Sequence, residues 1–319
     1  MAKQNQKDLE ALRKLENPVE NQSTDNFEVE VEDNKPNILD GYKIIERYNL
    51  PQDGNLYPES WEFAYRCPVA KEVANFSTLQ EGDNPAIVAA CEDLIRKCVI
   101  IFDTEKNRQV SSGQICDAHR TFFLLLLRDF YLPGNPIKYP SVCRHCTEPM
   151  EINLTANKLK YTRLSDKLIN AFDGRSFSLV MPEIEEPINF LVPSVEVSSR
   201  IFKYIVKVYR DSQNDAKNHE NKEENKNIYD KQFLLLAPYL YVRGNETVKE
   251  IIQKFKQIQK DEKLFKAYID IAVKLKLDNL DYIENTCDKC GSEEEALLRF
   301  PGGWKAMFIS AEDNTGYFN

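Results

Sequence analysis

Apolar residues recur at helical spacing in several parts of the chain. The clearest helix is predicted over residues 84–102, where an Asn-Pro pair suits the first turn and the apolar positions fall on one face. Further helices are predicted over residues 117–132, 198–212, 231–242 and 247–277. These segments predict a protein with a mainly helical body.

Short runs of β-branched and aromatic residues, interrupted by Pro and Gly, predict strands between the helices. One such region covers residues 42–69, and two short strands are predicted at 135–142 and 149–154. The segments 176–183 and 187–194 predict a hairpin. The fold class expected is therefore α+β, a helical body with short β-hairpins.

Two polar segments divide the chain. Residues 1–40 contain ten acidic and five basic residues, which predicts a disordered acidic tail, either simply solvated or folding on contact with a partner. Residues 211–227 contain one apolar residue and predict a flexible linker. The organisation expected is this tail, an α+β core at 41–210, the linker, and a helical segment at 228–319.

Four cysteines carry the most specific chemical pattern. Cys143 and Cys146 are separated by two residues, as are Cys287 and Cys290, and each pair lies between β-prone segments. A C-x-x-C turn at a hairpin tip directs two thiolates the same way, and two such tips provide the four-thiolate set of a structural zinc site. We call residues 143–147 the first knuckle and residues 287–291 the second, and we predict a split zinc ribbon with these four ligands.

The length of chain between the two knuckles bears on that prediction. The 140 residues between Cys146 and Cys287 far exceed the spacing within a compact zinc ribbon, so metal binding would close a long loop and become folding energy for it. Two pairs of reduced thiols, or a redox pair, are the alternatives, but neither pair is followed by the helix that redox chemistry expects. His145 is a further possible ligand, although its place inside the first knuckle favours a solvent-facing side chain.

The remaining cysteines favour packing. Cys91 and Cys98 lie seven residues apart on the apolar face of a predicted helix, and Cys67 follows a predicted strand. Cys116 and His119 resemble a nucleophile and its base, but no orienting acid or oxyanion motif accompanies them. We expect all four of these cysteines to be structural.

Charge and motif content narrow the functional classes. The net charge of −9 and a pI near 5.2 disfavour general nucleic-acid binding, and the lysine-rich segment 247–277 has an apolar stripe typical of a core helix. No phosphate-binding loop, dinucleotide motif or H-E-x-x-H sequence occurs, and three histidines leave little acid–base equipment. The apolar run Phe122–Leu127 is too short to span a bilayer and no secretory signal is visible, so a soluble protein is expected. Trp304 and Phe308 either pack internally or form a contact patch.

The order of motifs resembles a viral family. The segment YNLPQDGNLYP has the form Leu-Pro-x-x-Gly-x-x-Tyr, and it precedes RDFYLPGNPIKYPSVCRHC, EPMEINL, VMPE, NFLVPS and the late TCDKCG. In this order the chain resembles the baseplate hub subunits and hub assembly proteins of T-even-type contractile-tailed bacteriophages. The resemblance covers residues 41–210 and 281–319. The first knuckle departs from the second in carrying Thr147 where the second has Gly291.

This resemblance implies a non-enzymatic protein of the virion tail baseplate, or one that acts in the host cytoplasm during tail assembly. It carries Cys143, Cys146, Cys287 and Cys290 over as metal ligands, with Zn²⁺ as a structural cofactor. The partners it implies are other baseplate or tail proteins, with no small-molecule substrate and no membrane span. The alternative function is a zinc-ribbon nucleic-acid-binding or transcription-related protein, and an enzyme is the third possibility.

Overall fold

The computed structural model divides the chain into two units, Met1–Asp40 and Gly41–Asn319, and every described residue belongs to the second. The described residues are 41–80, 84–160, 163–170, 172–173, 176–179, 188–214, 231–240, 246–276, 282–301 and 303–309. The predicted tail 1–40 and residues 215–227 of the predicted linker lie outside these ranges. Residues 211–214 belong to helix α6 (Val195–Asn214), so the polar segment begins inside a helix.

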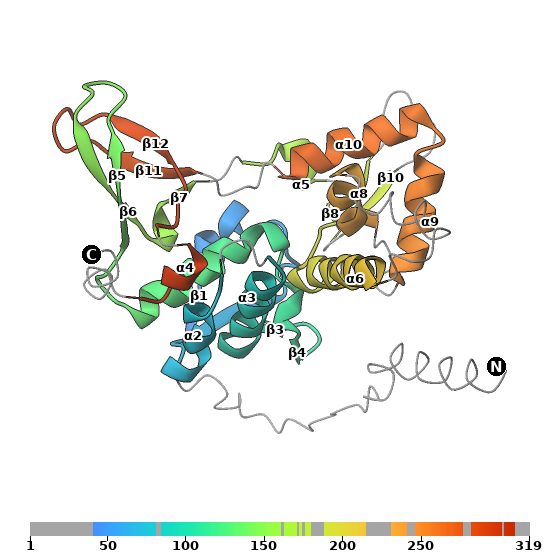
Figure 1. Cartoon of the computed structure of the whole chain (residues 1–319), viewed down its shortest axis with the longest axis horizontal. Helices are drawn as coiled ribbons and strands as arrows, with labels where there is room; N and C mark the ends of the chain where they lie inside the picture. The colour runs from blue at the N-terminus through green and yellow to red at the C-terminus, as the bar shows by residue number, and fades with distance from the viewer. Residues whose placement is uncertain are drawn as a thin grey trace. The chain divides into compact units, whose positions relative to one another are not determined.

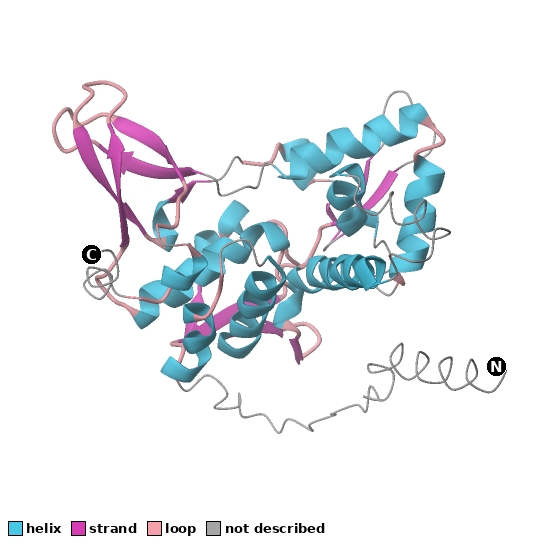
Figure 2. Ribbon diagram, viewed as in Figure 1, coloured by secondary structure: helices cyan, strands magenta, loops and turns pink. Residues whose placement is uncertain are grey.

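An antiparallel four-stranded sheet organises the first part of the described chain (Figures 1 and 2). Its strands follow one another in sequence order: β1 (Tyr42–Ile45), β2 (Trp61–Arg66), β3 (Val99–Asp103) and β4 (Arg108–Val110). The helices next to it are α2 (Ala70–Ser77), α3 (Asn84–Cys98) and α4 (Arg120–Tyr131). Helix α3 contacts β3 and helix α4 contacts β2, which buries one side of the central strands.

The helix predicted over residues 84–102 is wrong at its C-terminal end. Helix α3 stops at Cys98, and the next residues, Val-Ile-Ile-Phe, form most of strand β3. Consecutive β-branched and aromatic residues favour a strand, and Val99, Ile101 and Asp103 alternate with less buried neighbours as the period of a strand requires. Pairing of β3 with both β2 and β4 completes the sheet.

The Leu-Pro-x-x-Gly-x-x-Tyr motif forms a tight loop between β1 and β2. The guanidinium of Arg47 donates to the carbonyl oxygens of Gly54, Tyr57 and Pro58 at 2.8, 2.8 and 3.0 Å. Gly54 has φ +73°, and a Cβ at this position would lie 2.8 Å from Cγ of Arg47. Glycine is therefore required here for both backbone conformation and space. The motif therefore has a structural role, because it fixes the loop whose Tyr57 side chain packs in the hydrophobic core.

A three-stranded sheet and a group of helices follow in the later part of the described chain (Figure 2). The strands, in the order β10-β9-β8 and all antiparallel, are β8 (Phe172–Asp173), β9 (Ser176–Leu179) and β10 (Ile188–Leu191). The helices with α6 are α5 (Asp166–Ile169), α8 (Lys231–Leu236), α9 (Val248–Ile258) and α10 (Glu262–Lys276). Pairing of β9 with β10 confirms the predicted hairpin. All strand pairs in the described residues are antiparallel, and this agrees with the α+β class.

The single helix predicted over residues 247–277 is two helices. Helix α9 begins with a reciprocal capping box between Thr247 and Glu250 and ends at Ile258. The carboxylate of Asp261 then accepts the backbone N–H groups of Lys263 and Leu264 at 3.0 and 3.1 Å, which starts α10. The Asp261 carboxylate therefore begins a new helix at a point where the apolar periodicity of the sequence shows no break.

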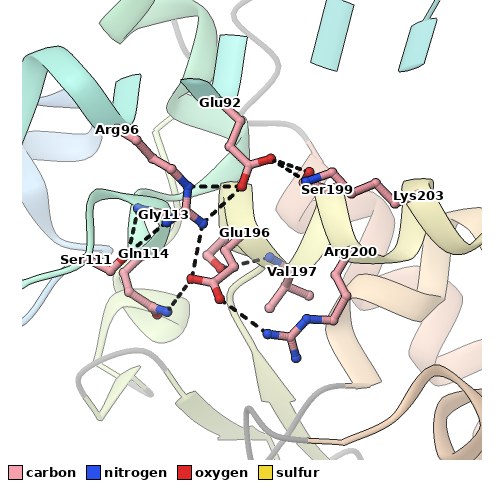
Figure 3. Close-up of polar contacts among 11 residues, drawn as sticks. Glu92, Arg96, Ser111, Gly113, Gln114, Glu196, Val197, Ser199, Arg200 and Lys203 are labelled. Carbon is pink, nitrogen blue, oxygen red and sulfur yellow. Dashed lines mark hydrogen bonds and ion pairs between the residues drawn. The ribbon is translucent and has the colours of Figure 1, made fainter. Parts of the chain in front are cut away.

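A buried carboxylate joins α3 to α6 (Figure 3). Glu92 on α3 accepts hydrogen bonds from Arg96 on its own helix at 3.0 Å, and from Ser199 and Lys203 on α6, with Lys203 at 3.2 Å. Burial opposes ionisation of Glu92, but the Ser199 hydroxyl and the two cations outweigh it and hold the pKa of Glu92 below its ordinary value. A charge buried with this many partners fixes the position of α6 on α3.

The loop at residues 111–114 completes the same junction (Figure 3). Glu196 on α6 pairs with Arg96 at 3.6 Å and accepts from Gln114 at 3.5 Å. A Cβ on Gly113 would lie 2.7 Å from Arg96 Nη2 and 2.9 Å from Glu196 Oε2, so glycine allows the loop to approach this pair closely. The backbone N–H of Val195 donates to the Ile115 carbonyl at 2.8 Å and holds the start of α6 against the loop.

The C-terminal aromatic residues pack internally. Phe308 is buried, and its ring lies 4.9 Å from that of Phe76 on α2 and 6.1 Å from that of Tyr131 on α4. Trp304 is half-buried and its ring lies 5.1 Å from that of Phe300. Core packing is thus the structural role of Phe308.

Among the described helices, none combines the length and apolar composition needed to cross a membrane.

Candidate metal centre

Two hairpins far apart in sequence present the four predicted cysteines. The first consists of β5 (Ile137–Val142) and β6 (Pro149–Leu154), and the first knuckle is its turn. The second consists of β11 (Tyr282–Thr286) and β12 (Glu293–Leu297), and the second knuckle is its turn. Figure 1 shows the green first hairpin beside the orange and red second hairpin. Strand β7 (Leu159–Lys160) pairs with β11 and extends the second sheet.

The two knuckles share one backbone hydrogen-bond pattern. In the first, the N–H of Cys143 donates to the Glu148 carbonyl at 2.9 Å and the N–H of Thr147 donates to the Cys143 carbonyl at 3.0 Å. In the second, the N–H of Cys287 donates to the Ser292 carbonyl at 2.9 Å and the N–H of Gly291 donates to the Cys287 carbonyl at 2.8 Å. Thr147 takes the left-handed conformation that glycine takes in the second knuckle. The missing glycine therefore does not change the geometry of the first knuckle.

The four thiols converge. Sγ of Cys143 lies 3.6 Å from Sγ of Cys290, Sγ of Cys146 lies 3.7 Å from Sγ of Cys287, and all four sulfurs lie within 4.8 Å of one another. Four sulfurs about 2.3 Å from a tetrahedral ion stand about 3.8 Å apart, so the cluster has the dimensions of a thiolate ligand set. A disulfide needs a sulfur separation of about 2.0 Å, which these pairs do not have. The predicted site residues thus form one cluster that could bind a metal ion.

Electrostatics favour a cation at the centre of this cluster. Hydrogen bonds from Ser292 lower the pKa of the Cys290 thiol to about 6. For Cys146 a backbone hydrogen bond at Glu148 favours the thiolate, but burial and the three neighbouring thiols outweigh it and raise the pKa to about 12. Four sulfurs this close cannot all be anionic without a compensating positive charge. A divalent ion would supply that charge and deprotonate all four.

Ser292 is a contributor that the cysteine pattern alone does not reveal. Its hydroxyl lies 3.0 Å from Sγ of Cys290 and 3.5 Å from Sγ of Cys143. The N–H of Cys146 also donates to Sγ of Cys143 at 3.4 Å. Donors to sulfur stabilise thiolates and orient them toward a metal. In the sequence, the signal is only that a hydroxyl residue follows the second knuckle.

Contacts other than sulfur hold the two hairpins together. The ammonium of Lys289 in the second knuckle pairs with the carboxylate of Glu148 beside the first. The Tyr139 hydroxyl on β5 donates to the Leu297 carbonyl on β12 at 2.9 Å. Two contacts besides those of the sulfurs therefore link one hairpin to the other.

Among the described residues, the cluster comprises the four knuckle cysteines alone, and the other cysteines, His119 and the exposed His145 lie outside it. Cys91 and Cys98 are fully buried, and burial raises the pKa of each thiol to about 12. Nδ1 of the buried His119 lies 2.9 Å from the Tyr57 hydroxyl, and burial lowers the pKa of His119 to about 3. This histidine stays neutral in a closed site, which agrees with a packing role rather than with the chemistry of a Cys-His pair.

Comparison with protein-family models, with curated proteins and with solved structures finds no match to this chain.

Proposed function

We propose that the chain is a non-enzymatic structural or assembly subunit whose four-cysteine cluster holds a structural zinc ion. The observation that supports this most directly is the convergence of four thiols from hairpins that 140 residues separate. Structural zinc sites have four protein ligands, whereas catalytic sites keep a position open for water or substrate. A set of four thiols, which is the whole cluster among the described residues, is therefore suited to stabilising the fold.

Zinc is the metal proposed because the donors are all thiolates. Tetrahedral sulfur sites select zinc or iron, and zinc needs no redox chemistry to do structural work. Bound zinc would link the middle of the chain to its C-terminal end and stabilise the long intervening segment. The chemistry that the ion supplies is electrostatic: it compensates the charge of four neighbouring thiolates.

The setting proposed for this subunit is the hub region of a bacteriophage tail baseplate, where it acts through protein–protein contacts. This part of the proposal is supported by the order of the Leu-Pro-x-x-Gly-x-x-Tyr motif, the two knuckles and the intervening hairpin. The loop formed by that motif is anchored by Arg47 and buries Tyr57, which is the behaviour of a folding motif rather than of a catalytic one.

A zinc-ribbon nucleic-acid-binding protein is the less favoured function. The hairpins carry the carboxylates of Glu148, Glu284, Glu293 and Glu295 close to the knuckles. Phosphate contact needs a concentrated basic surface, and these acids dilute the charge of the nearby lysines and arginines. Absence of salt-dependent retention on DNA is the expected result.

A genetic experiment tests the setting. In a phage genome that encodes this chain, a null allele should give particles without assembled tails, and electron microscopy of the lysate should show filled heads and no baseplates. A Cys287→Ser allele should give the same phenotype, and a Cys67→Ser allele should not. Normal tails in the null mutant would exclude the proposed baseplate role, whatever the metal content of the purified protein.

A further inference from the structure

A groove of about 360 Å³ lies between β5 and β12, on the side of the two hairpins next to the knuckles. Its apolar lining includes Val142, Met150 and Leu297. Val142 is 57% exposed and Leu297 is 48% exposed, and they are two of the six large apolar residues that stand exposed in the described part of the chain. Two exposed aliphatic side chains in one concave surface are typical of a binding site.

The backbone at the edges of this groove disfavours addition of a partner strand. The Leu297 carbonyl on β12 already accepts the Tyr139 hydroxyl. On β5, Cys143 faces β6 through its bond to Glu148, so alternation turns Pro140 toward the free edge, where it has no N–H to donate. A ligand must therefore be recognised mainly through its side chains.

The charges at the groove point to an acidic ligand. Arg144 and Arg299 both line it, and no ion pair joins Arg299 to a carboxylate within the described residues. Glu295 also lines the groove, but Lys160 pairs with it at 3.0 Å. Glu293, on the same strand as Glu295, would repel a continuous polyanion such as nucleic acid, whereas a single carboxylate can approach Arg299. An arginine beside an apolar wall suits a carboxylate that neighbours an apolar side chain.

We infer that this groove, the ribbon groove, is a docking site for a partner protein's loop that carries a carboxylate between aliphatic side chains. The inference rests on the proposed metal site in one respect. Val142 directly precedes Cys143, and Arg144 lies between Cys143 and Cys146, so metal binding fixes one wall of the groove. Met150 is flexible and polarisable, and it can adapt the lining to the bound side chain.

Methyl NMR of the zinc-loaded full chain tests this inference with one defined probe, the peptide acetyl-Gly-Leu-Glu-Leu-Gly-amide. We expect a saturable shift of the Met150 methyl resonance, at a concentration at least tenfold lower than for the same peptide with Lys in place of Glu. Arg299→Glu and Leu297→Ser should each weaken the peptide at least fivefold. Lys260→Glu reverses an exposed charge just after α9, outside the groove lining, and should leave affinity unchanged.

Three outcomes overturn the inference. They are the absence of a saturable shift, equal binding of the lysine peptide, or a Met150 shift that depends on protein concentration alone and disappears in Leu297→Ser. The last outcome would assign the groove to self-association. Zinc content measured in the same samples distinguishes the docking site from the proposed metal site. A chain that contains zinc but does not bind the peptide refutes the docking site and leaves the metal site standing. Removal of zinc with a chelator should abolish the peptide shift in the wild-type chain.

Discussion

Thr147 and Gly291 occupy equivalent positions in the two knuckles, with backbone φ of +61° and +71°. Each residue donates its N–H to the carbonyl of the first cysteine of its knuckle. A β-branched residue in the left-handed region is strained, and glycine is not. The two turns therefore have the same geometry at different conformational cost.

The asymmetry predicts that only one of the two exchanges lowers stability. Gly291→Thr should lower the free energy of unfolding by about 1–2 kcal/mol, because the left-handed conformation then carries a Cβ. Thr147→Gly should leave stability unchanged or raise it by up to about 1 kcal/mol, since relief of strain exceeds the added entropy of the unfolded chain. Urea unfolding of the zinc-loaded variants measures both. Gly134→Thr, at φ +73° outside the knuckles, is the control that should lose stability but keep its zinc affinity.

Replacing a single thiol should remove the metal. The wild-type chain should contain about one zinc per chain by elemental analysis, and Cys287→Ser should lose it, because three thiolates do not complete the tetrahedral set. Loss of the ion also removes the closure of the long loop, so the variant should unfold at lower urea concentration. Cys67→Ser, which alters a thiol outside the cluster, should retain full zinc content. Full zinc occupancy in Cys287→Ser would refute the shared four-cysteine site. Iron instead of zinc in the wild-type chain would show that the proposed metal is wrong.

The Ser292 hydroxyl should tune the affinity of the site without creating it. Ser292→Ala removes the donor that lies 3.0 Å from Sγ of Cys290, and we expect zinc affinity to fall about 10–100-fold while the stoichiometry stays at one. Competition with a chelator of known affinity gives the measurement. Ser292→Thr keeps the hydroxyl and should restore affinity, and Ser141→Ala on β5 is a matched control. If Ser292→Ala binds zinc as tightly as the wild type, the hydroxyl has no role in the site.

The cysteine cluster was predictable from sequence because it depends on local chemistry. Two C-x-x-C turns, each bounded by β-prone segments, specify hairpin tips that direct their thiols the same way. Ser292 and the Tyr139 contact with Leu297 were not predictable, because both depend on how the two hairpins meet across a large sequence separation. Spacing within a segment does not report the approach of distant segments.

The fold shows the same limit in its helix boundaries. Apolar periodicity located α3 and α4, but it could not separate the end of α3 at Cys98 from the strand that follows, since a short apolar run suits either. Nor did it show the break before α10, where the Asp261 carboxylate caps a new helix while the apolar stripe continues. Both errors lie where hydrogen bonding or sheet pairing overrides local pattern.

The buried His119 predicts a specific acid sensitivity. Burial lowers the pKa of His119 from 6.5 to about 3. Below about pH 6.5, this histidine therefore binds a proton in the unfolded chain but not in the folded chain. The unfolding free energy is therefore fully present above this pH and falls as pH drops, by up to about 1.4 kcal/mol per pH unit. His119→Gln keeps a polar partner for the Tyr57 hydroxyl but cannot titrate, and it should flatten the stability profile between pH 6.5 and 5. Zinc release in acid affects the wild type and the variant alike. The control is His145→Gln, which replaces an exposed histidine in the first knuckle and should leave the slope of unfolding free energy against pH unchanged. A slope that flattens in His145→Gln and persists in His119→Gln would place the acid sensitivity at the knuckle instead of in the core.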